Sequence, residues 1–133
     1  MVPPEVLFGV EPVRGWCYYY EKADLARQQG NWDEIIKFAA TVQQEKLSPY
    51  DQIEWLPFLQ AYAYAGDIKN VKNLSTRINT VPFYKKQACQ ILKGMDNVDG
   101  YALKPEISVE VQKLFCGGWH LASTGNFPGQ IVS

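Results

Sequence analysis

Two glycines divide the first part of the chain into similar segments. Gly30 and Gly66 lie 36 residues apart, and each follows a stretch in which apolar side chains recur every three or four residues. That spacing is the period of a helix with one buried face. A glycine directly after such a stretch is typical of a helix end, because glycine adopts the left-handed conformation without strain. The pattern therefore predicts two helical hairpins, each turning at its glycine.

The first hairpin is predicted from Trp16 to about Ser48. The expected buried face of its first helix consists of Trp16, Tyr19, Tyr20, Ala23 and Ala26, with Leu25 on the flank. Asn31 or Asp33 is placed to cap the second helix. The face of that helix is formed by Ile35, Phe38, Ala39 and Val42. Ser48 and Pro49 should end it, since proline cannot continue the backbone hydrogen bonding.

The second hairpin repeats the same order of signals. Asp51 is a plausible cap, and Trp55, Phe58 and Tyr62 form an aromatic face before Gly66. Pro57 inside this helix should start it late or kink it. After the glycine, the apolar face continues through Ile68, Val71, Leu74 and Ile78.

The repeat fades after Ile78, but two more helices are expected. Thr80 is predicted to cap a fifth helix with Pro82 in its first turn. A sixth helix runs from Pro105 to a stop at Gly117 and covers the open end of the array. The predicted organisation is a linker-like lead-in over 1–14, a helical domain over 15–117 and an irregular tail over 118–133.

The stretches "GNWDEII" and "GDIKNVK" resemble the turn and second-helix opening of the tetratricopeptide repeat family, and Trp55 and Tyr62 match its first-helix aromatic positions. Its units are helical hairpins of about 34 residues. The resemblance implies an all-α fold, with antiparallel hairpins stacked as a short right-handed array of about six helices. The chain departs from the family at the second-helix alanine, which is Ile35 in one unit and Val71 in the other.

Composition excludes several classes of partner. The chain carries 13 basic and 14 acidic residues and has a sequence pI near 5.8, so it has no basic surface for nucleic acid or an anionic membrane. Its longest apolar stretch, "WLPFLQAYAYAG", is too short to cross a bilayer, so no membrane insertion is expected. Cys17, Cys89 and Cys116 lack the spacing of zinc ligands or redox dithiols, and we interpret them as unpaired, buried apolar side chains. Three unpaired cysteines favour a cytoplasmic location.

Catalytic chemistry is not indicated. Asp33 and Glu34 fall in the first turn of a helix, where negative charge is favoured in any case. His120 is the single histidine and lies in a glycine-rich stretch without the context of a serine or cysteine nucleophile. We therefore predict that the chain is not an enzyme and that it has no catalytic residue, cofactor or metal.

The family register places an aromatic and polar groove along the first helices of the two hairpins. Its lining would be Cys17, Tyr20, Asp24, Arg27 and Gln28 from one hairpin and Ile53, Leu56, Gln60, Ala63 and Tyr64 from the other. From this set the predicted partner-binding residues are Tyr20, Asp24, Arg27, Gln28, Leu56, Gln60 and Tyr64. The opposing interpretation is that the aromatics fill a core between helices.

The sequence therefore predicts a non-catalytic protein interaction or scaffold module that binds a peptide or a helix in this groove. One alternative comes from a narrower resemblance: "WCYYYEKADLARQQGNWDEI" and "EWLPFLQAYAYAGD" are similar to the soluble C-terminal tail of bacterial polytopic membrane proteins of the glycosyltransferase kind. That would make the chain an accessory domain of a membrane-embedded parent. The other alternative is a binder of a sugar or lipid headgroup, with Tyr20 and Tyr64 in one cavity.

Overall fold

The first helical pair turns at Gly30, as its sequence predicts. In the computed structural model, which describes residues 15–96 and 103–117, α1 (Trp16–Gln28) is followed by Gly30 with φ of 70° and then by α2 (Trp32–Gln44). Asn31 caps α2, because its side chain accepts a hydrogen bond from the backbone N–H of Glu34 at 3.4 Å. The predicted helix end at Ser48 and Pro49 is wrong by a few residues. α2 ends at Gln44, and Lys46 takes the left-handed turn with φ of 58°.

The second pair begins with a change of helix type. A short 3-10 helix, η1 (Gln52–Trp55), leads into α3 (Leu56–Ala65), with Pro57 in the first turn of α3. The late start predicted from Pro57 is confirmed, since a proline is tolerated where its missing N–H would have no helical partner. Gly66 ends α3 with φ of 81°, and α4 (Ile68–Ile78) follows.

The third pair consists of α5 (Pro82–Asp96) and α6 (Pro105–Val111), which continues into a π-helical turn, η2 (Gln112–Cys116). Two sequence expectations fail here. The hydroxyl of Thr80 donates back to the carbonyl of Arg77 at 2.8 Å, so it serves the end of α4. Gly117 keeps helical dihedral angles, φ −62° and ψ −34°, and is not itself the stop. The lead-in over 1–14 and the tail over 118–133, which includes His120, lie outside the described residues.

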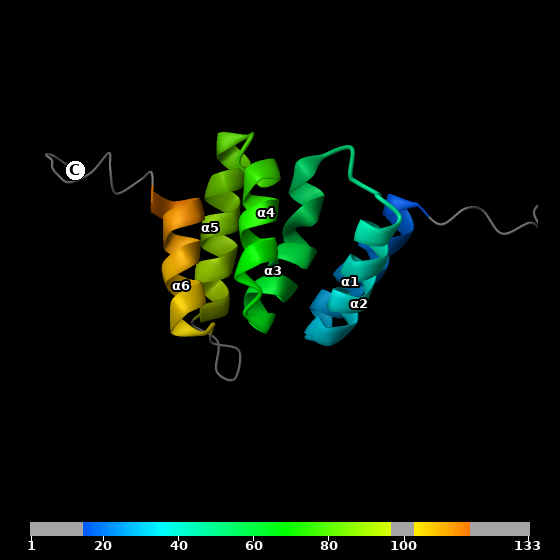
Figure 1. Ribbon diagram of the computed structural model, residues 1–133, viewed down its shortest axis with the longest axis horizontal. Coiled ribbons are helices and arrows are strands. Elements are labelled where there is room, and N and C mark those ends of the chain that lie inside the picture. Colours follow the sequence, from blue (N-terminus) through cyan, green and yellow to red (C-terminus); the bar gives the residue numbers. More distant parts are fainter. Residues whose placement is uncertain (1–14, 97–102, 118–133) are drawn as a thin grey trace, which may run out of the picture.

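The six α-helices pack against one another in chain order, which confirms the predicted all-α fold; the described residues contain no strand (Figure 1). Besides the contacts within and between successive pairs, α1 contacts α3 and α3 contacts α5. The first helices of the three pairs therefore form one continuous layer. Within the ranges 15–96 and 103–117, every helix is too short or too polar to cross a membrane.

α3 is the centre of the core. All residues from Pro57 to Ala63 are buried, so the middle of this helix buries more than one face, while the flanking helices bury a single face. Trp16 reaches across from α1 and packs its ring 4.6 Å from that of Trp55 and 5.3 Å from that of Phe58. The predicted buried faces are largely confirmed, but Leu25, placed on the flank of the first face, is 50% exposed.

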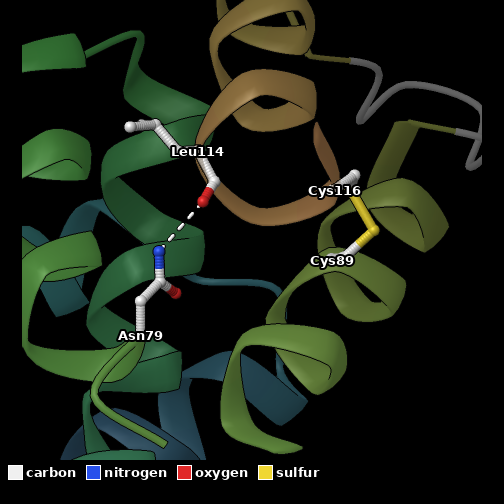
Figure 2. Close-up of a disulfide and its surroundings, with 4 residues drawn as sticks. All are labelled: Asn79, Cys89, Leu114 and Cys116. Carbon is white, nitrogen blue, oxygen red and sulfur yellow. Dashed lines mark hydrogen bonds between the residues drawn. A yellow bond between two sulfur atoms is a disulfide. The ribbon is translucent and has the colours of Figure 1, made fainter. Parts of the chain in front are cut away.

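The cysteines contradict the sequence interpretation. Cys89 on α5 and Cys116 in η2 form a disulfide (Figure 2). Cys17 is exposed on α1. The pairing arises because α5 and η2 lie side by side and bring the two Cα atoms to 5.4 Å, within the range that a disulfide requires. Beside the disulfide, the side-chain amide of Asn79 donates to the carbonyl of Leu114 at 2.9 Å and ties η2 to the end of α4 (Figure 2). The cytoplasmic preference rested on three unpaired thiols and loses its basis.

Candidate functional site

A pocket of about 340 Å³ opens where the first helices of the three pairs meet. Its walls come from α1, from the η1–α3 segment and from α5. We call it the α1–α3–α5 pocket. It is lined by Tyr20, Asp24, Arg27, Ile53, Leu56, Pro57, Gln60 and Ile91.

Helical spacing explains why these side chains share one surface. On α1, the lining positions Tyr20, Asp24 and Arg27 follow at intervals of four and three residues, which places them in one row. On the η1–α3 segment, Ile53, Leu56 and Gln60 follow the same rule. The pocket therefore has a polar wall on α1, while apolar side chains with one amide form the opposite wall.

The polar wall is held by hydrogen bonds within α1. Asp24 accepts from Nε of Arg27 at 2.9 Å and from the amide of Gln28 at 3.2 Å. Tyr20 stacks on Trp16 with ring centroids 6.4 Å apart, and the indole N–H of Trp16 donates to a carboxylate oxygen of Glu54 at 2.7 Å. These contacts fix the orientation of Tyr20 and Asp24 before any ligand binds.

Burial and the carboxylates around the pocket raise the pKa of Tyr20. Burial raises the pKa of Tyr20 above its usual value, the carboxylates of Asp24 and Glu54 raise it further, and the guanidinium of Arg27 opposes them. The net effect is a raised pKa, so the Tyr20 hydroxyl stays a hydrogen-bond donor to a higher pH than an ordinary tyrosine does. The two carboxylates outweigh the one guanidinium at this position.

Gln60 is the unusual member of the set. Its side chain lines the pocket from the buried helix α3 and is 9% exposed. Its amide forms no hydrogen bond with any other part of the chain that the structure describes. Buried polar groups in proteins normally have a partner. Gln60 therefore offers an unused donor and an unused acceptor to whatever enters the pocket.

Five of the seven partner-binding residues predicted from the sequence line this pocket: Tyr20, Asp24, Arg27, Leu56 and Gln60. Gln28 lies beside it and supports Asp24. Tyr64 does not line it; its ring lies 6.1 Å from that of Trp32 on α2. Of the wider predicted groove, Ile53 lines the pocket, whereas Cys17 is exposed elsewhere on α1 and Ala63 is fully buried.

Sequence reasoning missed the contribution of α5. Ile91 closes the pocket from the third helical pair. Ile91 follows the end of the internal repeat at Ile78, so no register linked it to the groove. Only the packing of α5 on α3 brings it there.

A second hollow of about 300 Å³ lies between α2, α4 and the segment that joins α2 to η1. Arg77 lies at its wall and holds its guanidinium 5.4 Å from the centre of the Trp55 ring. This arrangement is a cation–π contact that completes the packing around Trp55.

The described residues offer little for metal or acid–base chemistry. Between residues 15 and 95 and between 103 and 117, no three His, Cys, Asp or Glu side chains gather as metal ligands. The two charged side chains that line the α1–α3–α5 pocket, Asp24 and Arg27, form an ion pair with each other. The pocket can hold a ligand through hydrogen bonds, charge and apolar contact.

No protein-family model, curated protein or solved structure matches this chain.

Proposed function

We propose that the chain is a non-catalytic interaction module that binds a segment of another protein in the α1–α3–α5 pocket. The single observation that carries this proposal is the convergence of three helical pairs on one surface with a preorganised polar wall and an apolar wall. Peptide-binding sites combine these two elements, because apolar contact provides affinity and fixed polar groups provide orientation. The tetratricopeptide-like stacking of the helices is part of the same proposal.

The test compares two tyrosines on first helices of neighbouring pairs. Tyr20 lines the pocket, whereas Tyr64 packs beside Trp32 away from it. The full chain and its Tyr20→Ala and Tyr64→Ala variants are immobilised and exposed to lysate of the source cell, including detergent-solubilised membranes. We expect a partner that the native chain and Tyr64→Ala both capture and that Tyr20→Ala loses while its circular dichroism is unchanged. Equal capture by both variants, or no capture by the native chain, would contradict the proposal.

A second candidate is a small-molecule site. The pocket volume of about 340 Å³ falls within the range of small-ligand sites, roughly 300–1,000 Å³. Tyr20 lies in this pocket but Tyr64 does not, so a sugar or lipid headgroup would contact one tyrosine only. A thermal-shift series with sugars and nucleotides tests this candidate, and a rise in Tm that Tyr20→Ala abolishes would support it. The accessory role beside a bacterial membrane glycosyltransferase-like parent stays a prediction from sequence.

A further inference from the structure

The unpaired amide of Gln60 is the starting point. A carboxamide carries one carbonyl acceptor and an N–H₂ donor, and on Gln60 neither is used by another described residue. Gln60 is 9% exposed and faces the pocket from α3. A ligand that supplies one donor and one acceptor would satisfy it.

The backbone of an extended peptide supplies that pair. Each peptide unit has one N–H and one C=O, and in an extended segment without a neighbouring strand both are free. In a helical ligand the interior backbone groups already bond to each other, so they cannot pair with Gln60. The amide therefore favours an extended segment over a helix.

The apolar wall fits a side chain of such a segment. Ile53 and Leu56 are half-buried beside Gln60, and Ile91 faces them from α5. A peptide whose backbone lies along Gln60 would place an aliphatic or aromatic side chain against these residues.

The charges at the pocket favour a basic residue in the ligand, close to its apolar residue. Asp24 lines the pocket, and Glu54 is close enough to act on the Tyr20 hydroxyl together with Asp24. Arg27 compensates one of the two carboxylates through its bond to Asp24. The remaining negative charge is complementary to a lysine or arginine and would repel an acidic residue.

We propose that the α1–α3–α5 pocket takes an extended peptide in which one backbone amide pairs with the side chain of Gln60, an apolar residue packs on Leu56 and Ile91, and a nearby lysine or arginine lies toward Asp24 and Glu54. This inference rests on the proposed function and specifies its ligand.

The experiment uses short random peptides displayed on phage and panned against the full chain. Recovered peptides are resynthesised with both ends capped, and their affinities are measured by calorimetry for the native chain and for Gln60→Met, Asp24→Asn, Tyr20→Ala and Tyr64→Ala. Methionine keeps the length of glutamine without its amide, and asparagine keeps the shape of aspartate without its charge. Each peptide is also made with single ester links in place of its amides, which removes one backbone donor at a time.

We expect the recovered peptides to combine an apolar residue with a lysine or arginine. One ester replacement should weaken binding to the native chain by about five-fold, the effect of one hydrogen bond. Gln60→Met should lose the same factor and should no longer distinguish that ester from the amide. Asp24→Asn should weaken the basic peptides, and Tyr64→Ala should bind like the native chain.

Each contrary result has a separate meaning. If peptides bind and depend on Tyr20 but Gln60→Met binds them equally, the role of Gln60 is overturned while the proposed function stands. If the recovered peptides are acidic, the assigned ligand charge is wrong. If no peptide is recovered, or if binding ignores Tyr20 as well as Gln60, both this inference and the proposed function fail.

Discussion

Replacing Gln60 with methionine should make the protein more stable. Gln60 is 9% exposed as a whole residue, and its amide has no hydrogen-bond partner within the described residues. Burying an unpaired amide costs about 1–3 kcal/mol. The lower end applies here because the amide faces a pocket that water can enter. Methionine fills a similar volume and is a good helix former, so we expect the free energy of unfolding to rise by about 1 kcal/mol.

Thermal unfolding followed by circular dichroism measures this effect. For a domain of this size, 1 kcal/mol corresponds to a rise in Tm of about 4 °C. Gln28→Met is the matched control, because Gln28 is exposed on α1 and its amide already bonds to Asp24 at 3.2 Å. We expect that variant to stay within about 0.5 kcal/mol of the native chain. A lower Tm for Gln60→Met would refute the reasoning, since it would mean that the amide stabilises the fold as it stands.

Three further predictions concern the helix ends, the disulfide and a buried tyrosine. Gly66→Ala should destabilise the fold by about 1 kcal/mol, because Gly66 has φ of 81°. Gly94→Ala should stabilise the fold by about 0.5–1 kcal/mol, because Gly94 lies inside α5 with open space around it. Chemical denaturation measures both free energies of unfolding, and changes of the same sign would contradict this contrast. Replacing Cys89 and Cys116 with alanine should lower the free energy of unfolding by about 3 kcal/mol, since the disulfide joins residues 27 apart. Thiol counting on the untreated native chain should find one reactive thiol, not three. Burial and a nearby carboxylate raise the pKa of Tyr62 to about 12. The unfolded chain therefore loses this proton first, and stability should fall as the pH rises from about 10 to 12. Tm measured across that window should fall less steeply for Tyr62→Phe, and identical slopes would exclude the tyrosine as the cause.

Local signals in the sequence were enough to predict the helices. Gly30 and Gly66 could be assigned to turns because each directly follows a helix with an apolar face, where a glycine commonly adopts the left-handed conformation. Pro57 predicted the late start of α3 for an equally local reason. The row of Tyr20, Asp24 and Arg27 also follows from helical spacing alone, so much of the pocket wall could be predicted.

Features that depend on how helices pack could not be predicted. The bond between Cys89 and Cys116 requires α5 and η2 to lie side by side, and no spacing rule in the sequence indicates it. Ile91 joins the pocket for the same reason. Packing also explains why Leu25 is exposed: it lies on the flank of α1, where no other described helix covers it.

The disulfide keeps the third helical pair closed. Its covalent link joins α5 to η2, while α1 and α2 at the other end are joined to each other by packing and hydrogen bonds alone within the described residues (Figure 1). Local unfolding separates the less constrained elements first, so we expect η2 to stay on α5 under conditions in which α1 can separate from α2. α1 carries the polar wall of the proposed binding pocket. A peptide that bridges α1 to α3 would therefore be expected to slow hydrogen exchange in α1.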